Sequence, residues 1–290
     1  SPKIEESSLK PLQQELESFC LLHHVRGTLI LSPEGINGTI CYASQSDDND
    51  PVLTMIQSKF LDVRTRISSD SRNVFVRLKI KIKSQIVTMG KNIDVSPTDT
   101  VGMYVKPGDE WDSLLRDPDC LVVDARNEYE IRIGTFEGAI NPHTENFTEF
   151  PDWLASEAAS AKKIAMFCTG GIRCEKATSL ATTLFPEKSV YHLEGGILAY
   201  LDTVKEDQSL YNGECYVFDQ RIAVTHGLQP SEQYVSCFAC RQPLTIQERQ
   251  DPSFKEGLSC PYCVKEATAK KLQRFEARNK QIELASKQIG

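Results

Sequence analysis

Three short apolar segments separated by helix-like stretches restrict the middle of this chain to one class of fold. The segments are 121–124 (LVVD), 163–167 (KIAMF) and 189–193 (SVYHL). Continuous apolar runs of this length are typical of strands buried on both faces, and strands that alternate with helices form a parallel sheet. We therefore expect a parallel α/β domain whose functional site lies at the carboxyl ends of its strands.

A cysteine-containing loop follows the second of these strands. The sequence CTGGIRC (168–174) lies between that strand and a predicted helix. Backbone N–H groups and the positive end of the helix dipole would then face the sulfur of Cys168, and Arg173 adds a permanent positive charge, so the thiolate is favoured. Gly170 and Gly171 let the backbone curl around the sulfur. The loop predicts a reactive cysteine in a cradle that holds a persulfide or another anion, whereas a buried structural cysteine would leave Arg173 unexplained.

Three further residues are candidates for roles beside this loop. Cys174 is close enough in sequence to act as a resolving thiol, by thiol exchange with an oxidised or persulfidated Cys168. Alternatively, Cys174 is only a small residue that caps the start of the helix. Asp124 and Arg126 lie at the end of the first strand, on the same edge of the sheet. They either orient the loop or the substrate, or form a structural ion pair.

The usual cofactor motifs are weak or missing. No G-x-G-x-x-G sequence for a nucleotide cofactor occurs in the chain. His192 and Glu194 have the H-x-E spacing of two ligands of a facial iron triad, with His226 as a conceivable third. Spacing without geometry is a weak signal, and a histidine at a strand end is more often a packing residue.

The first 92 residues predict an α+β domain. The predicted elements are helix 9–24, strand 25–31, turn 32–38, strand 39–42, helix 50–60 and strand 74–88. This is the ferredoxin-like order without its opening strand, so we expect that strand upstream of Ser1.

The last of these strands carries positive charge on one face. In VFVRLKIKIK (74–83) apolar residues alternate with Phe75 and with four cations, Arg77, Lys79, Lys81 and Lys83. Same-face neighbours in a strand lie about 6.8 Å apart, which suits an RNA phosphate backbone with Phe75 stacked on a base. A solvated face that protects an edge strand is an equally good explanation. The whole chain has 33 Lys and Arg against 40 Asp and Glu, a net charge of −7. RNA binding therefore requires such a local basic surface.

Four cysteines near the C-terminal end have the spacing of a metal site. Cys237-Phe-Ala-Cys240 and Cys260-Pro-Tyr-Cys263 are separated by 19 residues, as in a four-cysteine zinc ribbon. Such a closed tetrahedral site makes Zn²⁺ structural, while a redox dithiol pair or an iron–sulfur cluster would use the same ligands. The helix predicted at 264–287 carries cations that could also touch RNA, namely Lys270, Lys271, Arg274, Arg278 and Lys280.

These features predict three domains and a reducing environment. The domains are a ferredoxin-like domain at 1–92 whose basic strand could bind RNA, a catalytic domain at 93–212 and a zinc-ribbon segment with a helix at 213–290, with a linker near 91–100. Six of the ten cysteines lie in the two C-x2-C pairs and the Gly-rich loop and are expected to serve chemistry, which indicates the cytoplasm, or an organelle interior if an upstream targeting segment exists. The other four, Cys20, Cys41, Cys120 and Cys215, are expected to pack as small hydrophobic residues. No apolar run approaches the roughly 18–20 residues that span a bilayer and no signal pattern opens the chain, so membrane insertion and export are not expected.

The central segment resembles the rhodanese domain. The resemblance is carried by 121–142 (LVVDARNEYEIRIGTFEGAINP), the loop 168–174 and 191–200 (YHLEGGILAY), in the rhodanese order. Four residues separate Cys168 from Arg173, as in the sulfurtransferase loop, whereas the related dual-specificity phosphatases have one more. The resemblance implies a catalytic cysteine at 168 and argues against a phosphatase.

Over nearly its whole length the chain resembles the bacterial tRNA uridine(34) hydroxylase family. The motifs are SPEGINGTI (32–40), FCTGGIRCEKA (167–177), YHLEGGI (191–197) and ECYVFDQRIAV (214–224). This resemblance implies oxygen-dependent hydroxylation of the wobble uridine of tRNA to 5-hydroxyuridine, with Cys168 as the essential cysteine. Two alternatives remain: a sulfurtransferase that carries sulfane sulfur on Cys168, and an RNA- or protein-binding adaptor.

A thiolate suggests a covalent route for such a reaction. Addition of Cys168, or of its persulfide, to C6 of uracil makes C5 nucleophilic, so that oxygen reacts there. We expect Arg173, Cys174, Asp124 and Arg126 to support this chemistry. The loop residues expected to hold the substrate are Thr169, Gly170, Gly171 and Ile172, and the expected partners are the anticodon arm of tRNA and a sulfur or electron donor.

Overall fold

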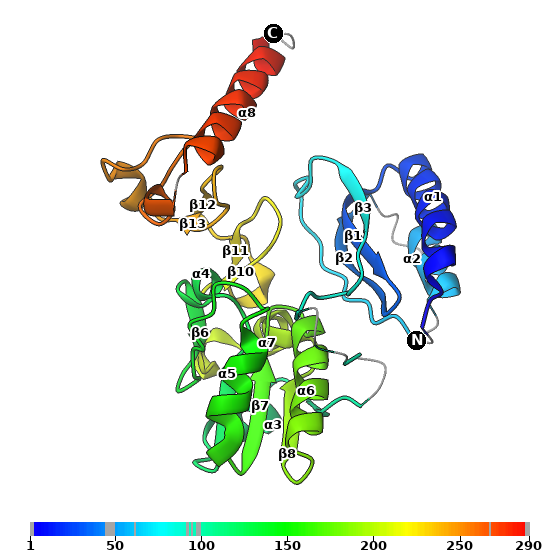
Figure 1. Cartoon of the computed structure of the whole chain (residues 1–290), viewed down its shortest axis with the longest axis vertical. Helices are drawn as coiled ribbons and strands as arrows, with labels where there is room; N and C mark the ends of the chain where they lie inside the picture. Colours follow the sequence, from blue (N-terminus) through cyan, green and yellow to red (C-terminus); the bar gives the residue numbers. More distant parts are fainter. Residues whose placement is uncertain are drawn as a thin grey trace.

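The computed structural model describes residues 3–43, 50–60, 62–90, 93, 95–96, 100–266 and 268–287 of the 290-residue chain. Three parts follow one another from blue to red in Figure 1: an N-terminal unit, a central unit and a C-terminal segment that ends in a projecting helix. Most of the linker predicted at 91–100 lies outside the described residues. None of the described helices is both long and apolar enough to cross a bilayer.

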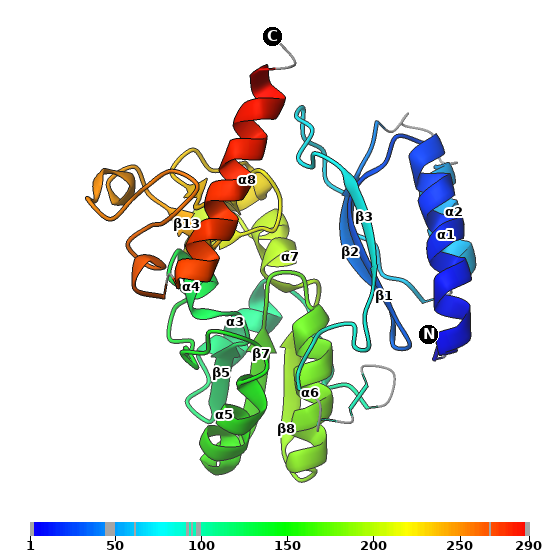
Figure 2. The same ribbon diagram turned by 45° about the horizontal axis from the view of Figure 1, so that its top comes forward.

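The N-terminal unit is a small sheet with both of its helices on one face (Figure 2). Its elements are α1 (Glu6–Leu22), β1 (Arg26–Ser32), β2 (Gly35–Cys41), α2 (Pro51–Lys59) and β3 (Leu78–Ile82). β1 is central, with β2 antiparallel on one side and β3 parallel on the other. The sheet and helices enclose a core that includes Leu16, Leu31 and Val52. The order of helix, strand, strand, helix and strand is the one predicted.

Two details of this unit differ from the sequence prediction. The strand predicted at 74–88 spans only Leu78–Ile82, because its partner β1 pairs with it over residues 27–31 alone. Val76, predicted on the buried face, is therefore 74% exposed. The turn predicted at 32–38 is confined to residues 33–34, since β1 and β2 pair in register from Ser32 and Gly35 onward.

The central unit is a four-stranded parallel sheet in the order β4-β8-β7-β5. Its elements are β4 (Met103–Val105), α3 (Asp109–Leu115), β5 (Cys120–Asp124), α4 (Glu128–Ile131), β6 (Gly134–Phe136), α5 (Phe150–Glu157), the 3-10 helix η1 (Ala158–Ser160), β7 (Lys163–Phe167), α6 (Ile172–Leu184), β8 (Ser189–Leu193), α7 (Gly196–Thr203), η2 (Glu206–Gln208) and β9 (Tyr211–Gly213). Alternate residues of β7 enter different cores: Met166 packs with α5 and α6, and Phe167 packs with α3 and α7. Helices therefore cover both faces of the sheet, as expected for a parallel α/β domain.

The C-terminal segment has short strands, and its part after residue 224 has little apolar core. Its elements are β10 (Cys215–Tyr216), β11 (Ala223–Val224), η3 (His226–Leu228), β12 (Val235–Ser236), β13 (Pro243–Leu244), η4 (Glu248–Gln250), η5 (Val264–Glu266) and α8 (Ala269–Lys287). The buried cluster around β13 consists of Leu244 with Cys237 and Cys260. Because this part buries so little apolar surface, it needs another source of stability. A metal ion bound by its cysteines would provide one.

Candidate active site

Cys168 lies in the turn between β7 and α6, the place that the sequence predicts. Gly171, the N-cap of α6, has a φ of 99°, a left-handed conformation that favours glycine. Its N–H donates a hydrogen bond to Cys168 Sγ over 3.1 Å. Because α6 begins at Ile172, the positive end of the helix faces the sulfur, as in other anion sites at helix N-termini.

The surroundings of Cys168 favour its thiolate. Burial acts to raise the pKa of Cys168, but a hydrogen bond from Cys174, the positive charge of Arg173 and the N–H groups of Cys174 and Gly171 outweigh it and lower the pKa to about 6. Burial and the adjacent Cys168 raise the pKa of Cys174 well above its ordinary value. These shifts favour a thiolate at Cys168 and a neutral thiol at Cys174.

We expect a titration of the thiolate absorbance to show this directly. The difference between the native protein and Cys168→Ser should have an inflection near pH 6, with the thiolate present above that pH and lost as pH falls through it. Cys174→Ala removes a donor to a charged group, which should move the inflection up by about 1–2 pH units. An inflection above pH 8 in the native protein would contradict this account of the loop.

Arg173 is held by a buried carboxylate. Its Nη1 and Nη2 atoms contact the two carboxylate oxygens of Glu130 at 2.7 Å each, and Nη2 donates to Thr169 Oγ1 over 3.3 Å. Burial acts to raise the pKa of Glu130, but Arg173 and Arg126 lower it below the ordinary value. The paired carboxylate fixes the guanidinium beside the loop.

Glu130 was not predicted from the sequence as a site residue. It is the third residue of the short helix α4 and accepts a hydrogen bond from the backbone N–H of Asn127, in a capping box. The N-x-x-E spacing could have indicated the helix start, but the partner Arg173 lies 43 residues further along the chain. Only the fold brings the two together.

Asp124 and Arg126 have the geometry of a structural ion pair. Both side chains are fully buried, and Arg126 contacts the two carboxylate oxygens of Asp124 at 2.8 and 2.6 Å. Arg126 also donates to the carbonyl of Gly134 at 2.6 Å, and Thr135 donates to Asp124. The pair therefore ties the end of β5 to β6, and neither side chain is exposed to a substrate.

The segment YHLEGGI packs against the backbone of the cysteine loop. At the start of α7, the N–H of Ile197 donates to the Cys168 carbonyl over 2.9 Å, and the N–H of Leu198 donates to that of Thr169 over 3.1 Å. A Cβ atom on Gly196 would lie 2.5 Å from the carbonyl oxygen of Cys168. Glycine is thus required for this close approach, and the motif positions the loop backbone.

The N-terminal unit also contacts this region, through two residues of α6. Lys176, which is fully buried, donates to Glu34 Oε1 over 2.7 Å and to the carbonyl of Val87 over 3.2 Å. Its neighbour Glu175 pairs with Arg64 at 2.7 Å. The motifs SPEGINGTI and FCTGGIRCEKA, far apart in sequence, therefore meet at α6, the helix that follows the cysteine loop.

Comparisons with known proteins agree with this arrangement. Residues 3–86 match the family described as the UPF0176 acylphosphatase like domain, and residues 108–203 match the rhodanese-like domain. A protein of Acaryochloris marina named tRNA uridine(34) hydroxylase is 46% identical over 286 residues, which cover 97% of this chain and 90% of that protein. The chain belongs to the tRNA uridine(34) hydroxylase family.

Further relatives extend the comparison. The tRNA uridine(34) hydroxylase of Agrobacterium fabrum is 47% identical over 279 residues, 94% of this chain and 87% of that protein. Among solved structures, a rhodanese-related protein from Thermoplasma volcanium is 18% identical, matching 34% of this chain and 91% of its own, with a TM-score of 0.26. The two domain matches confirm the predicted ferredoxin-like and rhodanese-like folds, and the names of the hydroxylase relatives do not favour the sulfurtransferase alternative.

In this member of the hydroxylase family the four cysteines of the C-terminal segment converge. The sulfurs of Cys237, Cys240, Cys260 and Cys263 lie within 4.8 Å of one another. Sγ of Cys260 is 3.7 Å from that of Cys240 and 3.6 Å from that of Cys263. Tetrahedral Zn–S bonds of about 2.3 Å place neighbouring sulfurs about 3.8 Å apart, so the cluster has the dimensions to hold a metal ion.

The iron triad considered from the sequence does not form among the described residues. His192 is buried with both ring nitrogens unpaired, and Glu194 is exposed. Burial and the charge of Arg64 lower the pKa of His192 to about 4, and its ring packs against Tyr104 at 4.1 Å. In the part of the chain that the structure describes, only the four cysteines form a group suited to a metal.

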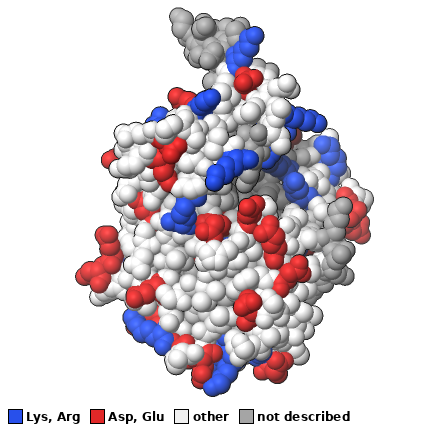
Figure 3. Space-filling view, turned by 60° about the vertical axis from the view of Figure 1, so that its left-hand side comes forward, with Lys and Arg blue, Asp and Glu red and all other residues white. Residues whose placement is uncertain are grey.

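Cations from two parts of the hydroxylase family member lie near one another. Lys79, Lys81 and Lys83 are exposed along and just after β3, and Arg77 precedes it. Partial burial and the charges of Arg77, Lys81 and Arg241 lower the pKa of Lys79. Arg241 follows the first cysteine pair, so the basic strand and the cysteine segment contribute to one positive region. Figure 3 shows Lys and Arg side chains gathered around a hollow on one face of the molecule.

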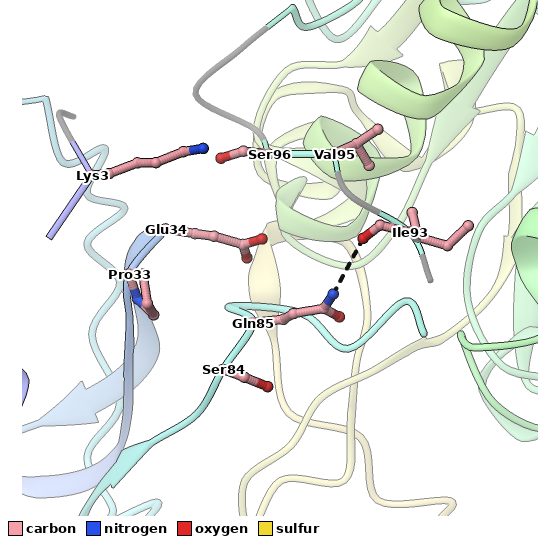
Figure 4. Close-up of a pocket in the computed structure, with 8 residues that line it drawn as sticks. All are labelled: Lys3, Pro33, Glu34, Ser84, Gln85, Ile93, Val95 and Ser96. Carbon is pink, nitrogen blue, oxygen red and sulfur yellow. Dashed lines mark hydrogen bonds between the residues drawn. The ribbon is translucent and has the colours of Figure 1, made fainter. Parts of the chain in front are cut away.

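A separate pocket lies beside the first motif of the family. It is lined by Lys3, Pro33, Glu34, Ser84, Gln85, Ile93, Val95 and Ser96 (Figure 4). Gln85 closes one wall by donating to the Ile93 carbonyl over 3.5 Å. None of the lining residues belongs to the cysteine loop, so the pocket is not the site of the cysteine chemistry. Its link to that site is Glu34, the partner of Lys176.

Proposed function

We propose that this protein hydroxylates the wobble uridine of tRNA at C5, with molecular oxygen as co-substrate. The observation that carries the proposal is the low-pKa cysteine together with the contacts of two further family motifs: the glycine turn at Gly196 binds the backbone of the cysteine loop, and Glu34 pairs with Lys176 in the helix that follows the loop. Relatives with about the same length of chain are named tRNA uridine(34) hydroxylases.

We propose that Cys168 acts as a nucleophile on the uracil ring. Its thiolate forms a bond to C6, and the electron pair of the C5–C6 double bond moves to C5. Dioxygen and one proton then give a C5 hydroperoxide. A two-electron donor, such as a pair of thiols, and two protons cleave the O–O bond to leave C5–OH and water. Loss of the C5 proton and release of the thiolate restore the double bond, so one oxygen atom is gained and Cys168 is regenerated.

The neighbouring side chains have supporting roles in this scheme. Cys174 donates its thiol hydrogen to Cys168, and the Arg173–Glu130 pair keeps a positive charge beside the sulfur when the ring bears negative charge. The residues proposed to hold the uracil are those of the loop, Thr169, Gly170, Gly171 and Ile172. Gly170 is the exposed member of this set.

We propose that the anticodon arm binds across the positive region. Lys81 and Arg241 lie close enough to Lys79 to lower its pKa. The mutual repulsion of these cations is unfavourable in the free protein, and a bound polyanion would relieve it. The charge of the whole chain is −7, so this local surface supplies the attraction. A reducing compartment such as the cytoplasm suits both tRNA and the ten free cysteines.

We propose that the ion held by the four cysteines is a structural Zn²⁺. Cys240→Ser should lower the zinc content from about one ion per chain and make the C-terminal segment sensitive to protease, because its apolar cluster is small. Elemental analysis and limited proteolysis measure these effects, and Cys120→Ser, outside the cluster, serves as the control. Full zinc content in Cys240→Ser, or iron in place of zinc, would overturn this assignment.

The test of the function is the mass of the nucleosides in treated tRNA. Unmodified tRNA is incubated with the protein and a thiol reductant in air and under argon. A gain of one oxygen atom on uridine in air but not under argon is expected. Replacement of oxygen by sulfur, or no change together with thiocyanate production from thiosulfate and cyanide, would instead support a sulfurtransferase and refute the hydroxylase.

A further inference from the structure

We propose that the phenyl ring of Phe218 is the surface on which the target uracil stacks. The proposal rests on the proposed function, since it names the residue that receives the base. All twelve phenylalanines lie in the described part of the chain, and only Phe218 and Phe238 among them are exposed. Phe218 is the more exposed of the two, at 62%.

The backbone holds this ring outward in a fixed position. Tyr216 and Val217, the two preceding residues, are buried, and the rings of Tyr216 and Phe218 form a T-shaped pair with their centres 5.1 Å apart. After Phe218, Arg221 contacts both carboxylate oxygens of Asp219, at 3.0 Å and 2.6 Å. The strands on either side pair as β10 and β11. An exposed ring on such a rigid hairpin loses little conformational entropy when a base stacks on it.

The ring lies beside the cysteine loop. The guanidinium carbon of Arg173 is 5.9 Å from the centre of the Phe218 ring. Arg173 in turn acts on the Cys168 thiolate through its charge, and Glu130 holds it in place. Two residues after Phe218, the N–H of Gln220 donates to the carbonyl of Val74 in the N-terminal unit. Phe218 therefore lies between the reactive loop and the unit that carries the basic strand.

Uracil in an anticodon loop has a flat apolar face and is accessible without breaking a base pair. Enzymes that act on one base turn it out of its stack, and the lost stacking must be replaced by the protein. An aromatic side chain provides this, at a value of about 1–3 kcal/mol for each base. The motif ECYVFDQRIAV, which the cysteine chemistry does not explain, thereby acquires a role: it presents the aromatic residue.

The experiment compares Phe218→Ala, Phe218→Trp and Phe185→Ala in the full chain. Stacking of one base predicts a loss of about 5- to 150-fold in kcat/KM for Phe218→Ala, and near-native activity for Phe218→Trp. Phe185 is the control, because it is the C-cap of α6, at the end of that helix away from Cys168, and a cation, Lys188 Nζ, lies 4.4 Å from its ring centre. Phe185→Ala should keep native kcat/KM. Native kcat/KM in Phe218→Ala, or an equal loss in Phe185→Ala, would overturn the proposal.

A binding readout separates this proposal from the hydroxylase assignment. The indole introduced in Phe218→Trp should lose fluorescence when an anticodon stem-loop with uridine 34 is added, and should keep it when the same stem-loop lacks that base. Subtraction of the native protein's signal removes the contribution of Trp111 and Trp153. Quenching without hydroxylation would mean that the function is wrong but the stacking site is right. Equal quenching by both stem-loops would refute stacking even if hydroxylation occurs.

Discussion

Replacing Cys168 by Ser should abolish the formation of 5-hydroxyuridine, with a rate lower by about 10⁴-fold or more. A serine hydroxyl is not ionised at neutral pH, so it cannot use the features that lower the pKa of Cys168 to about 6. The fold should survive, because serine is slightly smaller than cysteine and its oxygen can still accept the N–H of Gly171. The measurement is nucleoside mass analysis of tRNA treated in air.

Cys120→Ser provides the matched control for this variant. Cys120 is a half-buried cysteine at the start of β5, paired with the start of β7, so it lies at the opposite end of these strands from the loop. We expect it to leave the rate within about twofold of the native value, since substitutions away from special contacts change little. If Cys168→Ser remained fully active, the covalent scheme would be excluded. Equal inactivation of both variants would point to general damage from loss of a thiol.

The elements with strong local patterns were predictable from the sequence. The runs KIAMF and SVYHL coincide with β7 and β8, and LVVD forms β5 with one added residue, because continuous apolar runs between helices fix both the type and the length of a buried strand. β4 was missed, since three residues carry too little pattern. β3 was predicted too long because strand alternation continues in sequence where the partner strand has ended.

The cysteine loop could be predicted because its residues are contiguous in the sequence, as are those of each strand. The residues that hold the loop and the following helix in place are distant in the sequence and could not be predicted. Glu130 reaches Arg173 across 43 residues, and Glu34 reaches Lys176 across 142. A single sequence contains no signal that pairs such distant charges. From the sequence, these motifs indicated only a family resemblance. The fold shows what they do: each motif contacts the cysteine loop or the helix that follows it.

Lys176→Met should destabilise the protein by about 3–5 kcal/mol, the cost of removing one partner from a buried ion pair. The ammonium group is fully buried, while the Glu34 side chain is 12% exposed and would lose the one cation with which it forms an ion pair among the described residues. Because this pair joins the N-terminal unit to α6, the loss should appear as earlier separation of the two units in urea. Hydrogen exchange of the β1 and β2 amides measures it.

A second substitution shows whether the unpaired charge is the cause. Glu34→Gln keeps an oxygen that accepts the N–H of Ile86, now bonded to Glu34 Oε2 at 2.7 Å, but carries no charge. The double variant Glu34→Gln with Lys176→Met should therefore be more stable than Lys176→Met alone, by about 1–3 kcal/mol. Lys162→Met provides the surface control: its 2.9 Å contact with Asp119 is exposed, so its loss should cost at most about 1 kcal/mol. If Lys162→Met and Lys176→Met cost the same, the buried pair does not hold the two units together, and the contact between the two motifs at α6 is only a matter of proximity.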